Sequence, residues 1–182
     1  MNNTMIRYLS ILVICAGLLL SCVSSPSSPP TSSSGGSSSG GTTATPQTQA
    51  ERDRRQNIYM QYLRSEGYVP SLDKDNDILF KLDGYNFYII IGKNDPSFLI
   101  LLKPNIWSID SESERVQAAN AVAYANRATK VAKAYISGST NQWVSLSAEL
   151  YVDDPNQFGL LFKRLIRMIN KAGSEFEGQM RN

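Results

Sequence analysis

Acidic residues at alternate positions are the first arrangement in the chain that could do chemistry. Asp73, Asp75 and Asp77 have the spacing with which an EF-hand loop begins, where carboxylates supply oxygen ligands to Ca²⁺. The same loop needs glycine at its sixth position and glutamate at its twelfth, and this chain has Ile78 and Gly84 there. Because Ile78 is better explained as the start of a strand, we interpret the segment as a solvated acidic turn and predict no metal site.

The residue types that are missing exclude more chemistry than the acidic turn suggests. The 182-residue chain has no histidine and two cysteines, which removes Ser–His and Cys–His nucleophiles and most zinc sites. Its 18 Lys and Arg against 16 Asp and Glu lack the basic excess of nucleic-acid binders. We predict no enzyme, no catalytic residue, no cofactor and no nucleic-acid partner. Carboxylate chemistry through Asp75, Asp77 and Glu149, in an enzyme or a small-molecule receptor, remains the alternative.

The second cysteine has the setting of a lipid attachment site. Arg7 precedes an apolar run over residues 11–20, which is shorter than the roughly 20 residues that span a bilayer but suits a secretory signal peptide. The run ends in Leu19-Leu20-Ser21-Cys22, which is similar to the lipobox of bacterial lipoproteins. We predict a signal peptide over residues 1–21 and a lipid anchor on Cys22. The alternative is an ordinary secretory signal that contains a chance cysteine.

The segment after Cys22 is typical of a tether. Residues 23–49 contain only Val, Ser, Pro, Thr, Gly, Ala and Gln, so they cannot bury enough apolar surface to fold. We predict a disordered tether over residues 22–50 and a folded domain over residues 51–182. The expected location is the cell envelope, where the anchor holds the protein on a membrane with its domain periplasmic or surface-exposed.

Apolar periodicity and turn signals predict eight elements in the folded domain. Asp83-Gly84 is a two-residue hairpin signal, and Ser111 with Glu114 has the spacing of a capping box. In order, we expect a helix over 52–66, strands over 78–82, 85–91 and 98–102, a helix over 111–130, strands over 131–136 and 143–152, and a helix after Asp154-Pro155. This predicts an α+β fold, a mostly antiparallel five-stranded sheet in the order α-β-β-β-α-β-β-α, with helices mainly on one face.

This order of elements resembles the YbjN domain family, which shares the fold of type III secretion chaperones. The resemblance also rests on Gly67-Tyr68-Val69-Pro70, on Asp75 to Phe80 and on the segment from Asn126 to Lys133. It covers nearly all of residues 55–178 and implies a chaperone, regulator or interaction module, often dimeric, with no catalytic residues to carry over. A signal peptide and a lipid anchor depart from the cytoplasmic secretion chaperones.

Two surfaces of the predicted domain are candidates for contacts. Alternation along 143–152 places Trp143, Glu149 and Tyr151 on the side opposite the apolar residues, and Tyr135 can join them. Exposed aromatic residues among polar ones are typical of interaction surfaces; the alternative is that loops of the same chain cover them. The last helix carries a basic side, Lys163, Arg164, Arg167 and Lys171, which is either a solvated face or a contact for anionic headgroups.

These observations predict a membrane-tethered, non-catalytic interaction domain, chaperone-like or regulatory. Through its sheet it would bind a segment of an unidentified protein partner, or bind itself as a homodimer. The alternative from another class is a structural envelope lipoprotein whose domain has no separate ligand.

The lipid anchor gives the first testable prediction. Cys22→Ser should abolish acylation, since the thioether forms on the cysteine sulfur, and should move the protein from the detergent phase to the aqueous phase. Mass spectrometry of the wild-type protein should show an added diacylglycerol. A wild-type chain without lipid contradicts the anchor.

Overall fold

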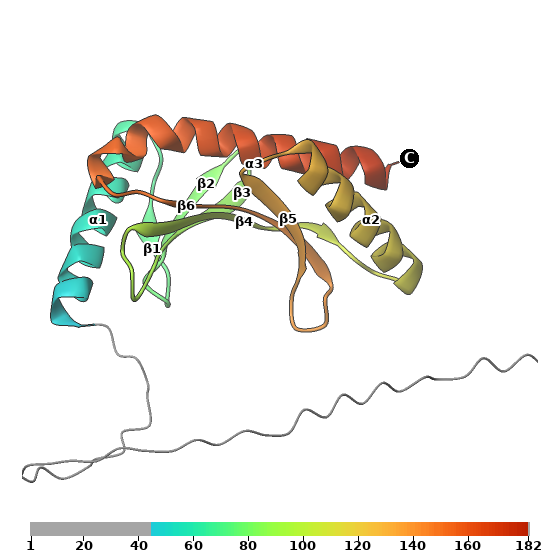
Figure 1. Ribbon diagram of the computed structural model, residues 1–182, viewed down its shortest axis with the longest axis horizontal. Coiled ribbons are helices and arrows are strands. Elements are labelled where there is room, and N and C mark those ends of the chain that lie inside the picture. The colour runs from blue at the N-terminus through green and yellow to red at the C-terminus, as the bar shows by residue number, and fades with distance from the viewer. Residues whose placement is uncertain (1–44, 182) are drawn as a thin grey trace, which may run out of the picture. The chain divides into compact units, whose positions relative to one another are not determined.

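The computed structural model describes residues 45–181 (Figure 1). The predicted signal peptide, Cys22 and most of the predicted tether lie outside these residues. In chain order the elements are α1 (Pro46–Ser65), β1 (Ser71–Leu72), β2 (Ile78–Leu82), β3 (Tyr85–Ile91), β4 (Phe98–Ser108), α2 (Glu112–Ala128), β5 (Ala132–Ser137), β6 (Trp143–Tyr151), the short 3₁₀-helix η1 (Pro155–Gln157) and α3 (Phe158–Met180). Within residues 45–181, no helix has the length and apolar character needed to cross a bilayer.

The strands form one antiparallel sheet, and the α+β fold class is confirmed. Their order in the sheet is β1-β2-β3-β4-β6-β5. The predicted count of five strands is wrong because β1, which pairs Ser71 with Leu79 and Leu72 with Ile78, adds a sixth. A two-residue strand has no alternation that a sequence pattern could reveal, so the segment was predicted as part of a turn.

The first helix begins earlier than predicted. α1 begins at Pro46 rather than at residue 52, and the Thr45 side chain accepts a hydrogen bond from the Thr48 amide. Thr45 followed by proline at the first helical position is a standard helix start. The predicted boundary between tether and domain at residue 51 therefore lies inside α1.

The hairpin of β2 and β3 follows the predicted residues at both strands. Asp83 and Gly84 link them with φ angles of 52° and 81°, the left-handed values that a two-residue hairpin requires. Ile78 pairs with Ile89 and Phe80 with Phe87. These four apolar residues therefore lie on the same face of the sheet.

β4 is longer than the predicted strand over 98–102. Its pairing with β6 is interrupted between Lys103 and Trp107, where Asn105 has φ 54° and donates its backbone N–H to the Ser145 hydroxyl. Such a bulge inserts unpaired residues and restores the register beyond them. Pro104 and Asn105 interrupt the apolar pattern, so the sequence predicted an end where the strand continues.

The hydrophobic core lies between the helices and one face of the sheet. Figure 1 shows α3 lying across that side of the sheet. The core side of α3 is fully apolar and carries Phe158, Phe162, Leu165, Ile169, Ala172, Phe176 and Met180. Phe162 contacts Phe80 of β2, and Tyr59 of α1 stacks on Phe158 with ring centroids 4.2 Å apart. Among residues 45–181, the buried apolar residues all fall within 59–180, so a chain of residues 45–182 includes the core that the structure describes.

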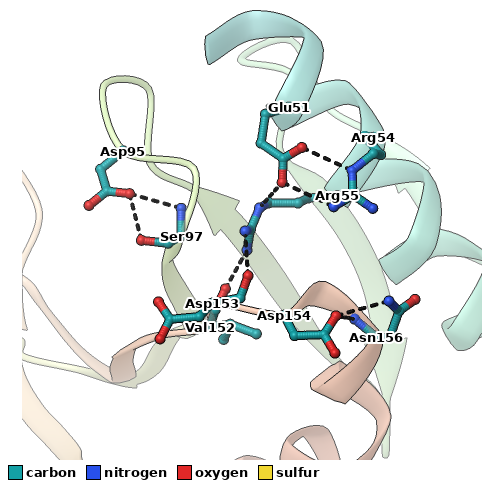
Figure 2. A network of polar contacts seen from close by, with 9 residues as sticks. All are labelled: Glu51, Arg54, Arg55, Asp95, Ser97, Val152, Asp153, Asp154 and Asn156. Atoms are coloured by element: carbon teal, nitrogen blue, oxygen red, sulfur yellow. Dashed lines mark hydrogen bonds and ion pairs between the residues drawn. The ribbon is translucent and has the colours of Figure 1, made fainter. Parts of the chain in front are cut away.

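Two buried arginines hold α1 against the ends of the strands. The Arg55 guanidinium donates to the Val152 and Asp153 carbonyls and to the Glu51 carboxylate, as Figure 2 shows. Arg52 donates to the Ile91 carbonyl, 3.3 Å away. A buried charge is stable only where its donors are satisfied, so these carbonyls define where α1 can dock.

Arg55 and Arg54 give a matched test of this docking. Both bind Glu51, but the Arg55 side chain is 7% exposed and the Arg54 side chain 54%. Arg55→Ala should lower the free energy of unfolding by about 3 kcal/mol, because the buried Val152 carbonyl and the part-buried Asp153 carbonyl lose a charged donor. Arg54→Ala should cost less than about 1 kcal/mol, as exposed ion pairs do. Urea denaturation measures both, and equal losses would contradict the role given to Arg55.

Candidate interaction surface

The second face of the sheet carries a patch of apolar side chains. Alternation along the strands directs them away from the buried core residues, and each is half-buried rather than buried. We call this patch the open sheet face, and its members are Leu79, Tyr88, Ile90, Phe98, Ile100 and Leu102. The helices described over residues 45–181 lie on the other side of the sheet or at its ends (Figure 1).

Strand register makes the open sheet face continuous. Leu79 is directly opposite Tyr88, which is opposite Leu102, and Ile90 is opposite Ile100. Side chains at opposite positions have Cβ atoms about 5 Å apart, within contact distance for large residues. The patch therefore crosses β2, β3 and β4 without a polar interruption.

The predicted surface residues do not form one patch. Tyr151 is 66% exposed, and its ring centroid lies 5.3 Å from that of Phe98, at the margin of the open sheet face. Glu149 is opposite Ile100, and Tyr135 is opposite Ser145 near the β5 edge. Trp143 is half-buried and eight residues from Tyr151, about 26 Å along a strand. The structure thus joins Tyr151 and Glu149 to the open sheet face and leaves Trp143 at the far end of β6.

A polar border separates the open sheet face from the β5 edge. The Lys133 ammonium lies 2.7 Å from a Glu149 carboxylate oxygen, and the Ser147 hydroxyl donates to the other oxygen. The hydrogen bond from Lys133 holds the pKa of the Glu149 carboxyl below its ordinary value. Burial, with Glu149 close by, raises the pKa of the Tyr135 hydroxyl. Glu149 is therefore a charged, oriented acceptor beside an apolar patch.

The residues of the open sheet face were not among the predicted surface residues, although the sequence contains a pattern that indicates them. The strand over 98–102 is apolar at every position, a pattern that is typical of a strand covered on both sides. In the structure only Leu99 and Leu101 of this segment are buried, while Phe98, Ile100 and Leu102 remain half-exposed. An apolar run indicates that neither face of the strand carries charged side chains, but it does not indicate which part of the protein covers the second face.

The carboxylates that could support an enzyme or receptor do not converge. Asp73 Oδ1 accepts the backbone N–H groups of Asp75 and Asp77, each at 2.9 Å, which is the geometry of a turn. These residues precede β2, three strand positions in the sheet from the Glu149 strand, or about 14 Å. Over residues 45–181 there is no group of three or more His, Cys, Asp or Glu residues that could hold a metal ion.

Two grooves on the surface differ in the acidic residues that line them. A groove of about 570 Å³ between α1 and α3 contains one acidic residue, Glu66, which is paired with Lys163 at 2.8 Å. A smaller groove of about 240 Å³ contains Lys103, whose ammonium lies 3.8 Å from the centre of the Tyr85 ring. Burial lowers the pKa of this amine. Asp83 and Glu177 line the same groove, and their charges act against this lowering.

These features define a small α+β domain whose antiparallel sheet has one helix-covered face and one open apolar face. No protein-family model matches the sequence, and no curated protein matches it significantly. Among solved structures, the fold is similar to that of YbjN from E. coli, a candidate transcription regulator, with a TM-score of 0.53 and 13% sequence identity. The match covers 67% of this chain and 90% of that chain. The chain thus has a YbjN-like fold, as the resemblance of the sequence predicted.

The Lys133–Glu149 pair should make part of the stability dependent on pH. Because the folded-state pKa of Glu149 lies below its unfolded value, the pair stabilises at neutral pH, and this contribution is lost as pH falls through the folded-state pKa. Glu149→Gln should therefore cost up to about 1 kcal/mol at neutral pH and nothing once the pH is well below about 4. Glu112→Gln, at a more exposed pair with Arg115, is the control. A Glu149→Gln cost that is the same at both pH values contradicts the assignment.

Proposed function

We propose that this protein is a non-catalytic interaction domain, carried on a lipid-anchored tether of the cell envelope, that binds a protein partner through the open sheet face. The partner is an apolar protein segment or a second copy of the chain. The YbjN-like fold supports the regulatory or chaperone-like class, since YbjN is described as a regulator and not as an enzyme. The setting of Cys22 in the sequence supports the anchor.

The observation that carries this proposal is the continuous apolar patch across β2, β3 and β4. A single half-exposed aliphatic residue is ordinary on a protein surface, but a contiguous patch marks a contact site. Tyr151 adds an exposed aromatic side chain at its margin, the residue type that contributes most to binding at interfaces. Glu149 and Lys133 supply a polar rim.

The sheet edges favour binding on the face rather than pairing of a partner strand. At the β5 edge, the Asn126 side chain donates to the Ala134 carbonyl and accepts its N–H, at 3.0 and 2.7 Å. The Thr129 hydroxyl also donates to the Ala132 carbonyl. At the other edge, β1 has two residues. A strand added by a partner needs a row of free backbone groups, and both edges restrict it.

Site-specific photo-crosslinking tests the proposal with a matched pair of tyrosines. Tyr88 lies in the open sheet face, and Tyr124 is exposed on α2. Tyr88→p-benzoylphenylalanine, in the full chain in its native cells, should give one discrete adduct on illumination, whereas Tyr124→p-benzoylphenylalanine should give none. The adduct's mass distinguishes the two kinds of partner, because a homodimer has twice the mass of the protomer.

Weakening the patch gives the complementary result. Ile100→Asp places a charge at a half-buried position of the patch. In a variant that circular dichroism shows to be folded, adduct formation through Tyr88 should fall at least about tenfold, as expected for the loss of a central apolar contact. Val116→Asp, at an exposed position on α2, should leave the adduct unchanged. If Tyr88 and Tyr124 both give no adduct, the interaction function is rejected in favour of a structural lipoprotein.

A further inference from the structure

The outward side of α3 forms a basic ridge. Leu160, Arg164, Arg167 and Lys171 recur at three- and four-residue spacing, all exposed, on the side of the helix opposite its buried residues. At 1.5 Å per residue the ridge is about 17 Å long. The acidic residues of α3, Glu175 and Glu177, follow only after its end.

The charges of this ridge are not used inside the protein. Within residues 45–181, Arg164, Arg167 and Lys171 form no ion pair with a carboxylate, whereas the neighbouring Lys163 pairs with Glu66. Holding like charges together without partners has a cost that an external anion would remove. The ridge is therefore complementary to a negatively charged partner.

Apolar side chains and shallow grooves accompany the charges. Leu160 is 74% exposed and Met168 38%. One groove is lined by Arg164, Arg167, Met168 and Lys171, and a second is lined by Met168 and Lys171 together with residues 128–131 of the α2–β5 connection. Cations surrounding protruding aliphatic groups are the arrangement of helices that lie at a lipid interface.

We propose that this ridge docks the domain on an anionic lipid surface, with the cations on phospholipid phosphates and Leu160 and Met168 against the acyl boundary. The inference does not depend on the open sheet face. It is supported by the geometry of that face, because α3 and the open sheet face lie on opposite sides of the sheet (Figure 1). A domain docked through α3 presents its open sheet face away from the bilayer.

The length of chain before α1 is compatible with such docking. The C-terminal part of α1 contacts the start of α3, where the Tyr62 hydroxyl donates to the Gly159 carbonyl. Thr45 therefore lies about one helix length, roughly 30 Å, from the ridge. The 23 residues from Cys22 to Thr45 can extend to about 75 Å, so a lipid on Cys22 and the ridge can reach the same membrane.

Vesicle co-sedimentation of residues 45–182, which include the whole core but not Cys22, tests the proposal. The domain should bind vesicles of mixed phosphatidylglycerol and phosphatidylcholine, should bind pure phosphatidylcholine at least about tenfold less, and should be released by salt. Arg164→Glu with Arg167→Glu should weaken binding at least about tenfold, since each cation near an anionic surface is worth about fivefold. Circular dichroism checks that each variant is folded.

A control with the same net charge separates the ridge from a general attraction. Lys74→Glu with Lys93→Glu reverses two exposed turn cations and should leave vesicle binding nearly unchanged. Equal losses in the two double variants would overturn the proposal, as would equal binding to both kinds of vesicle. Full competition by free glycerol phosphate would also overturn it, because the ridge would then be a site for a small anion. None of these outcomes bears on the crosslink through Tyr88.

Discussion

The burial of one apolar side of α3 against one face of the sheet determines where the other surfaces of this domain lie. The helix packs across the strands through Phe158, Phe162 and Phe176. Arg164 and Arg167 lie on the opposite side of the helix and are therefore exposed to solvent. Because side chains alternate across a strand, the residues between the buried ones point away from α3 on the second face of the sheet. The packing of α3 on one face of the sheet thus places a basic helix surface and an apolar sheet surface on opposite sides of the domain.

α1 is held by directional contacts as well as by its buried apolar residues, Tyr59, Met60 and Leu63. Four side-chain hydrogen bonds, two of them buried and two part-buried, reach backbone carbonyls: Arg52 to Ile91, Arg55 to Val152 and Asp153, and Gln56 to Asn76. These carbonyls lie at strand ends and turns, where the sheet's own ladder does not use them. Both cysteines precede the described residues, so packing and such hydrogen bonds hold this part of the chain without a disulfide.

Local signals predicted the elements well, and long-range geometry accounts for what they missed. Asp83-Gly84 determined both strands of its hairpin, because the turn needs residues that accept positive φ. The extension of β4 depends on a bulge whose Asn105 amide binds Ser145, forty residues away, and no local pattern contains that partner. The large distance between Trp143 and Tyr151 could be predicted from the sequence, because the two residues lie at opposite ends of one strand. The apolar second face was also present in the sequence, but an apolar strand does not state how many layers cover it.

The contrast between the two edges of the sheet and its open face bears on how a partner can bind. The Asn126 side chain of α2 binds both the carbonyl and the N–H of Ala134 in the middle of β5. These two backbone groups are therefore not free to pair with a strand of another chain. Exposed strand edges pair readily with other chains, which is an aggregation hazard. Blocking the edges while the apolar face stays open favours side-chain recognition over backbone pairing. For the partner that we propose, specificity would then depend on the shape of the patch around Tyr88 and Ile100 and on the charged rim at Glu149.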